Sequence, residues 1–379
     1  MCKTIDNSLI RKRAKSKISR TFNISYQDRD IASLLVRDAN SLTVEEKNNI
    51  KSFYADQGFD KVKTAITDNQ IVPFSAHIFM TLDCDQEYWH KVHSSFIERN
   101  KKIISLLDSV FTKMREYECK SLTLTENFAV VLSSNSCIGC FSSGDVDLSA
   151  DINDMNKIVS GLDDLGFYSK QQPKSIGEYS GQSMQFYNGS AIDNGFWINV
   201  IWKPVTRAFL IQDKYETRLA NDRLVAKLVP NTQIRVLNDT SLMYFCALHI
   251  AAGHYYTLTP GLRLYVDIDR LARGCNIDWD EILKWAKEDN AGIRIAVVMY
   301  LSYKLFKTPI PKKLYEKALE NNRNIRFIRY LYDPESGQIQ GKSSKLRRLY
   351  VELASDDRNL LLNLLVRFTK LLFQKIKSI

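Results

Sequence analysis

The chain has 379 residues, 45% of them hydrophobic, and a formal net charge of +10. That is enough apolar material for a full core and enough length for two or three domains. No apolar stretch could cross a bilayer and none follows the first basic residues, so we expect neither a transmembrane segment nor a signal peptide. Seven irregularly placed cysteines indicate reduced thiols and a cytoplasmic location.

Basic residues are concentrated near the N-terminus. The segment Arg11–Lys17 carries five positive charges in seven residues. We expect residues 1–24 to form a basic flexible arm. Such a run is usually a solvated arm, and the alternative is contact with RNA or another anionic surface.

Residues 25–118 are expected to form an N-terminal helical region, because apolar residues recur there at intervals of three and four. Ile103, Leu107 and Val110 are examples. His90 and His93 have a spacing that suits metal ligands. No other ligand lies nearby in the sequence, so we interpret them as ordinary helix positions.

Residues 119–237 alternate between strand and helix patterns. Asn127 could cap a short helix, and Asp154 and Gly166 would begin and end a second one. The predicted strands are Ser121–Thr125, the segment that starts at Asp145, Ser183–Tyr187 and Phe196–Trp202. The order predicts an α+β fold, in which a small mixed sheet has helices on one side and helical regions flank it in the chain.

Asp145 and Asp147 are the most informative residues of this central part. Side chains alternate along a strand, so the two carboxylates would share one face while Val146 and Leu148 enter the core. Carboxylates at this spacing can converge on a hard divalent cation that prefers oxygen ligands. The alternative is a pair of aspartates that caps a turn.

Cys137 and Cys140 form a CxxC pair that could belong to a zinc site. A zinc site needs two further ligands, but no second CxxC follows and the nearest later histidine is His249. The sequence therefore does not predict zinc here.

Residues 238–379 are expected to form a C-terminal helical domain. Its last helix, Asn359–Ile379, has a broad apolar stripe and several basic residues. Docking on the body of the protein is the simpler interpretation of this helix, and a membrane-surface or dimer helix is the alternative.

Three segments together carry a family resemblance. They are Asp145–Leu148, the histidine-containing Leu248–His254 with the following Leu262–Ile268, and Ile277–Leu283. In order and spacing the chain resembles, over about residues 70–315, an uncharacterised bacterial nucleotidyltransferase family. That family lies within the DNA polymerase β-like nucleotidyltransferase superfamily, so the resemblance implies a core of that fold.

The resemblance implies transfer of a nucleoside monophosphate from an NTP to an acceptor, with Mg²⁺ or Mn²⁺. The acceptor would be a small molecule, a sugar, a protein or RNA. It also implies roles for three groups of residues. Asp145 and Asp147 would bind metal; Ser133, Ser134, Ser142, Ser143 and Gly144 would contact the nucleotide; His249, His254, Arg263 and Asp267 would form a polar cluster facing the cleft.

Two positions depart from the family pattern. Glu126-Asn127 stands where the family usually has Lys-Gly, which removes a positive charge for phosphate. The third catalytic carboxylate is replaced by Asn199, which cannot accept a proton, although Asp193 in the preceding turn could approach. A weak or inactive protein that binds nucleotide, RNA or a protein partner is therefore the alternative to an active transferase.

Overall fold

The computed structural model describes residues 31–331 apart from 32, 69, 143, 170–182, 189–196, 204–211 and 257–261. Beyond residue 331 it describes only residues 350, 351, 353–355, 365 and 369. Arg11–Lys17, Ser143, Asp193 and nearly all of the predicted last helix lie outside these residues. Among the described helices, none combines the length and apolarity needed to cross a membrane.

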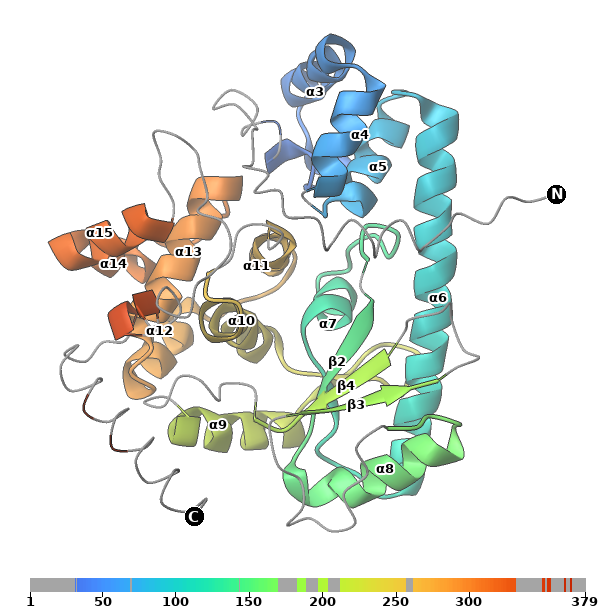
Figure 1. The fold of residues 1–379 in the computed structure, drawn as a ribbon, viewed down its shortest axis with the longest axis vertical. Coiled ribbons are helices and arrows are strands. Elements are labelled where there is room, and N and C mark those ends of the chain that lie inside the picture. The colour runs from blue at the N-terminus through green and yellow to red at the C-terminus, as the bar shows by residue number, and fades with distance from the viewer. Residues whose placement is uncertain are drawn as a thin grey trace.

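Helix α6 runs along one side of the molecule, from the N-terminal helices to α8 at the other end (Figure 1). Its buried face includes Trp89, Ile103 and Leu107. Helix α3 begins with a capping box, in which Thr43 and Glu46 satisfy each other's backbone N–H groups. The N-terminal elements are η1 (Ala39–Ser41), α3 (Val44–Gln57), α4 (Phe59–Asp68), α5 (Val72–Thr81) and α6 (Gln86–Glu116).

Six described strands form one mixed sheet in the order β3-β4-β2-β1-β6-β5. Strands β2 and β4 are parallel neighbours, and Asp147 lies opposite Asn199. The strands are β1 (Thr123–Leu124), β2 (Asp145–Ser149), β3 (Ser183–Tyr187), β4 (Trp197–Ile201), β5 (Lys227–Leu228) and β6 (Arg235–Val236).

The helices of the central part are α7 (Glu126–Ser133), η2 (Ile152–Asp154), α8 (Met155–Asp164) and α9 (Gln212–Leu224). Helices α7 and α8 match the two predicted helices, whereas η2 and α9 were not predicted, and Asn127 is not the N-cap of α7. Thr125 holds that position, and Asn127 has a non-helical backbone with φ of 29°. Gly166 follows α8 with φ of +77°, a conformation that glycine adopts without strain.

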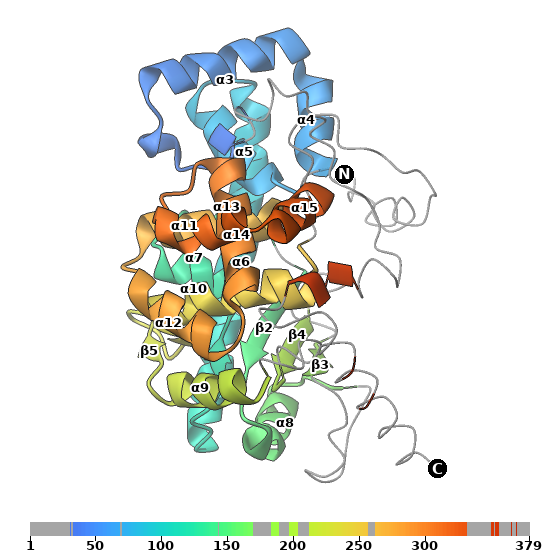
Figure 2. The same cartoon turned by 90° about the vertical axis from the view of Figure 1, so that its left-hand side faces the viewer.

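Helices dominate the C-terminal part, and α11 packs against α7, α10 and α13. Figure 2 shows α10–α13 stacked between the N-terminal helices and the sheet end of the molecule. The elements are α10 (Asp239–Leu248), the π-helical turn η4 (His249–Gly253), α11 (Leu262–Gly274), α12 (Trp279–Glu288), α13 (Gly292–Phe306), η5 (Lys312–Leu314), α14 (Glu316–Glu320) and α15 (Asn322–Leu331). Apolar side chains from all three parts form one continuous core, so the fold is a mostly helical α+β structure with the sheet in its middle.

Candidate functional site

Strand β2 presents Asp145 and Asp147 as the sequence alternation predicts. Val146 and Leu148 on the alternate face are fully buried. Asp145 is half-buried and the preceding Gly144 is exposed, so solvent reaches this end of the strand. Asp147, one pleat further in, is only 8% exposed.

Asp147 is a buried carboxyl group that lies near two other carboxylates. Asn199 Nδ2 donates a hydrogen bond of 2.8 Å to Asp147 Oδ1. Burial raises the pKa of Asp147 to about 8, and the neighbouring carboxylates of Glu126 and Asp145 add to this increase. A cation beside the carboxylates would offset both the energetic cost of burying them and the repulsion between them.

Glu126 belongs to the same acidic cluster, which the sequence analysis did not foresee. Glu126 is 5% exposed, and His249 Nδ1 lies 2.9 Å from Glu126 Oε1. Burial raises the pKa of Glu126, but the charge and hydrogen bond of His249 outweigh it and leave the pKa below its usual value. The cluster therefore contains a carboxylate–imidazole pair beside Asp147.

The backbone is strained at the start of α7, where Glu126 lies. Glu126 and Asn127 have φ of 54° and 29°, values that residues other than glycine rarely adopt. The adjacent Thr125 donates from its backbone N (3.0 Å) and its Oγ1 (3.1 Å) to the backbone oxygen of Asp147. These bonds fix the first turn of α7 against β2, and such strain is typical of functional sites.

Three residues of the predicted polar cluster, His249, His254 and Arg263, lie near enough to Glu126 for their charges to lower its pKa. The rings of His249 and His254 meet edge to face at 4.5 Å between centroids. Arg263 Nη1 donates to the carbonyl oxygen of Ser142 at 2.8 Å, so α11 holds the loop that leads to Asp145. Burial raises the pKa of Asp267 to about 7, although Arg263 oppositely lowers it.

The predicted nucleotide-contacting serines fall into two places. Ser142 and Gly144 adjoin Asp145, and Ser143 between them lies outside the described residues. Ser133 and Ser134 stand at the C-terminal end of α7, about 10 Å along the helix from Glu126 by the rise of an α-helix. Only the first group is next to the acidic pair.

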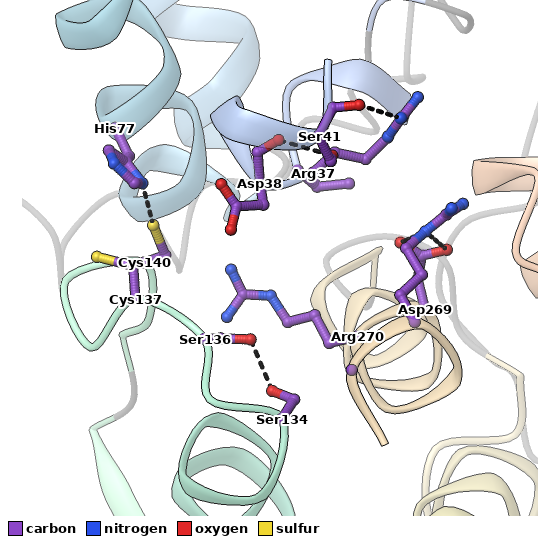
Figure 3. Close-up of a pocket in the computed structure, with 13 residues that line it drawn as sticks. Arg37, Asp38, Ser41, His77, Ser134, Ser136, Cys137, Cys140, Asp269 and Arg270 are labelled. Carbon is purple, nitrogen blue, oxygen red and sulfur yellow. Dashed lines mark hydrogen bonds and ion pairs between the residues drawn. The ribbon is translucent and has the colours of Figure 1, made fainter. Parts of the chain in front are cut away.

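Ser134 instead lines a separate cavity of about 250 Å³ between α5, α11 and the loop after α7 (Figure 3). Arg270 extends from α11 into the middle of this cavity, near Asp38 and Ser136 (Figure 3). Its lining includes neither Asp145 nor Asp147. The cavity and the acidic cluster are therefore distinct regions.

The donors of the acidic cluster suit a hard divalent cation. Asp145 and Asp147 offer carboxylate oxygens from one strand, and β4 brings Asn199 opposite Asp147. Asn199 Oδ1 is buried and has no hydrogen-bond partner among the described residues. A buried oxygen of this kind is costly unless it meets a cation or water, so the residues present fit Mg²⁺ or Mn²⁺.

A family model described as "Uncharacterised nucleotidyltransferase" matches residues 84–307, which is more than half of the chain. The matched segment contains the acidic pair, Glu126, Asn199 and the polar cluster. No curated protein matches the chain.

Proposed function

The chain belongs to this family of uncharacterised nucleotidyltransferases, and we propose that its acidic cluster transfers a nucleoside monophosphate from an NTP to an acceptor. The observation that carries the proposal is the placement of Asp145 and Asp147 on β2, with Asn199 opposite Asp147 and its buried Oδ1 lacking a hydrogen-bond partner in the part of the chain that the structure describes. The free cysteines and the NTP donor both suit the cytoplasm.

Asp145, Asp147 and Asn199 would hold one or two Mg²⁺ or Mn²⁺ ions together with phosphate oxygens of the NTP. Bound metal would neutralise charge on the entering and leaving oxygens, which phosphoryl transfer requires more than any covalent help from the protein. Gly144 and the adjacent Ser142 and Ser143 would offer backbone N–H and hydroxyl groups to the triphosphate. Arg263 supports this loop through its bond to Ser142.

In the proposed reaction an acceptor oxygen forms a bond to the α-phosphorus while the bond to the β-phosphate oxygen breaks. Pyrophosphate leaves with the electron pair of that bond. The acceptor's proton needs a base, and Asn199 cannot serve. We assign this step to the carboxylate of Glu126, which lies beside Asp147, because Glu126 raises the pKa of His249 and so favours an imidazole that already carries its proton.

Incubation of the purified full chain with each α-labelled NTP, Mn²⁺ or Mg²⁺ and a fractionated lysate tests the proposal. We expect label on an acceptor with wild type and a loss of at least about 10²–10³-fold in Asp147→Asn. Asp163→Asn is the matched control, because Asp163 is an exposed aspartate on α8. This control variant should retain full activity.

Two outcomes would contradict an active transferase. One is the absence of transfer with every NTP while the folded protein still binds nucleotide; this favours the binding protein that Asn199 and the missing Lys-Gly suggest. The other is equal transfer by wild type and Asp147→Asn, which would remove the acidic cluster from the reaction.

A further inference from the structure

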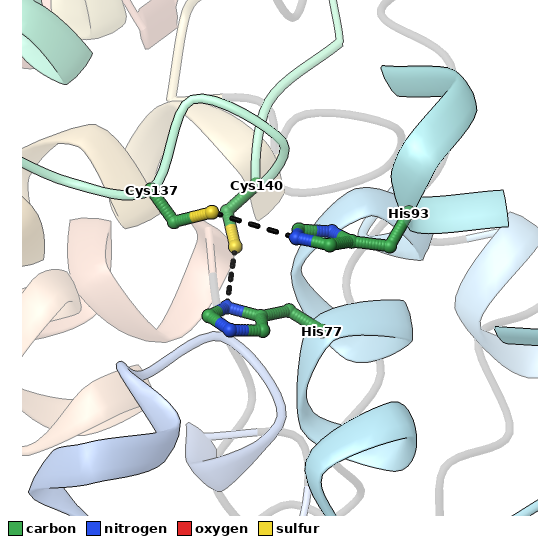
Figure 4. Close-up of side chains that lie close together, drawn as sticks. All are labelled: His77, His93, Cys137 and Cys140. Atoms are coloured by element: carbon green, nitrogen blue, oxygen red, sulfur yellow. Dashed lines mark hydrogen bonds between the residues drawn. The ribbon is translucent and has the colours of Figure 1, made fainter. Parts of the chain in front are cut away.

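Two cysteines and two histidines converge at a second place in the molecule. His77 comes from α5, His93 from α6, and Cys137 and Cys140 from the loop between α7 and β2 (Figure 4). One ligand atom from each residue lies within 4.8 Å of all the others. His77 Nδ1 is 3.0 Å from Cys140 Sγ, and His93 Nε2 is 3.5 Å from Cys137 Sγ.

These distances, from 3.0 Å to at most 4.8 Å, bracket the edges of a tetrahedral metal site, so small side-chain shifts would bring the four ligand atoms onto one ion. With zinc–nitrogen bonds of about 2.0–2.1 Å and zinc–sulfur bonds of about 2.3 Å, ligand atoms lie about 3.3–3.8 Å apart. Two thiolates and two imidazoles are also the donors that zinc prefers over harder ions. We propose that His77, His93, Cys137 and Cys140 bind a structural Zn²⁺ ion.

The surrounding residues shape the Cys137–Cys140 loop for this role. The side chain of Asn100, fully buried on α6, donates to the backbone oxygens of Ile138 (2.6 Å) and Phe141 (2.9 Å). Cys140 N donates to the Cys137 oxygen at 2.9 Å, which closes the turn. The two sulfurs are thus held on the same side of the loop before any metal binds.

Gly139 shows how tightly the loop is fitted to His93. A Cβ atom at this position would lie 2.5 Å from His93 Cε1 and 2.9 Å from His93 Nε2. Both distances are shorter than side-chain contacts allow, so only glycine lets the loop approach this imidazole. Close packing of a backbone against a histidine ring is unnecessary for a thiol pair that acts alone.

The histidines distinguish a metal site from a redox CxxC pair. The rings of His77 and His93 stack in parallel at 4.6 Å between centroids and direct one nitrogen each at a sulfur. A Cys137–Cys140 disulfide would leave both nitrogens without these partners. The arrangement therefore favours a metal ion shared by all four residues.

All four positions are supplied by the protein, so the site resembles closed structural zinc sites rather than catalytic ones that keep a position for water. His93 and Cys140 are buried, while His77 and Cys137 are half-buried and line the cavity of Figure 3. That cavity gives the ion an entry path. Bound zinc would tie α5 and α6 to the loop that leads into β2.

Elemental analysis of the full chain, purified without an affinity tag, tests this proposal independently of any transferase activity. We expect about one zinc per chain after dialysis against a weak chelator. In cobalt-substituted protein we expect the absorption of tetrahedral Co²⁺ with thiolate ligands. His93→Ala and Cys137→Ser should each reduce bound zinc at least fivefold and lower the melting temperature.

Matched controls use the same residue types elsewhere. His90 lies on the same helix as His93 but is exposed, so His90→Ala is the control for the histidines. Cys84→Ser removes a half-buried thiol outside the cluster and is the control for the cysteines. Both should retain full zinc. Gly139→Ala should lose zinc through the clash with His93, whereas Gly144→Ala, whose Cβ would come no closer than 3.8 Å to a neighbour, should retain it.

Three results would overturn the proposal. The first is wild-type protein that neither contains zinc nor binds added Zn²⁺ or Co²⁺ after thiol reduction. The second is His93→Ala protein with undiminished zinc. The third is a Cys137–Cys140 disulfide that persists under reducing conditions. Metal titration of folded wild type with a chromophoric chelator decides the first point even when the variants fail to fold.

Discussion

The loop between α7 and β2 leads into Asp145 of the acidic cluster and carries Cys137 and Cys140 of the Cys/His cluster, yet the two clusters differ in their metal-binding donors. The first offers oxygen donors, which suit a hard cation that exchanges with the nucleotide. The second offers sulfur and nitrogen donors, which suit a permanently bound borderline-soft cation. Hence we expect the first cluster to serve chemistry at the expense of stability and the second to serve stability alone.

Strain supports this contrast. In the acidic cluster Glu126 and Asn127 have strained backbones, and Asp147 is buried beside other carboxylates. In the Cys/His cluster the loop is braced by Asn100 and packs closely on His93. Natural proteins tolerate unfavourable local structure mainly where function needs it.

The largest difference between the two clusters is expected from Glu126→Gln. Removing the carboxylate that pairs with His249 should reduce the transfer rate by about 10²–10⁴-fold, the usual contribution of a positioned proton acceptor. Zinc content should not change, because Glu126 is not part of the Cys/His cluster. Single-turnover assays measure the transfer rate, and elemental analysis of the same preparation measures the zinc content.

Glu118→Gln, at an exposed glutamate, provides the control and should transfer at the wild-type rate. A normal transfer rate in Glu126→Gln would show that Glu126 takes no part in proton transfer. A parallel loss of zinc would mean that the two clusters are not independent.

A smaller effect is expected on the melting temperature, which should change in opposite directions when the two clusters are mutated. Asp147→Asn keeps the shape of the side chain and removes a buried carboxylate, so without divalent metal the melting temperature should rise by about 2–4 °C. Cys140→Ser should lower it, because zinc binding is folding free energy. Calorimetry of wild type, both variants and Asp163→Asn measures the difference; a fall in Asp147→Asn comparable to that in Cys140→Ser would contradict the contrast.

The smallest effect is expected from Asn199→Asp, which restores the third carboxylate. Added ligand charge should lower the Mn²⁺ concentration required for half-maximal transfer by about tenfold. The metal-free variant should also melt below wild type, because it adds a buried negative charge beside Asp147. An unchanged metal requirement would mean that Asn199 does not face the bound ion.

Local patterns predicted part of the fold and the placement of Asp145 and Asp147 on one strand. The strand alternation around Asp145 and Asp147, and the helix that ends before Gly166, depend on residues adjacent in the chain, so periodicity identifies them. Strands β5 and β6 have two residues each and are defined only by their pairing. No local pattern in the sequence predicted these two strands.

The missed groups have partners far apart in the sequence. Glu126 and His249 are separated in the chain by strands β2–β6, and Glu126 alone suggests only a repulsive charge. The Cys/His cluster combines a CxxC pair with His77 and His93, which precede it and lie on different helices. His77 and His93 reach the CxxC pair only through the packing of α5 and α6 against the loop after α7, which no spacing in the sequence indicates.

The most direct test of the central claim is a titration of Mn²⁺ into zinc-replete protein with a non-hydrolysable NTP, followed by electron paramagnetic resonance of free Mn²⁺. The account predicts that wild type and Cys84→Ser bind about one or two Mn²⁺ per chain, and that Asp147→Asn binds at least about tenfold more weakly while it keeps its zinc. Equal Mn²⁺ binding by wild type and Asp147→Asn would contradict it.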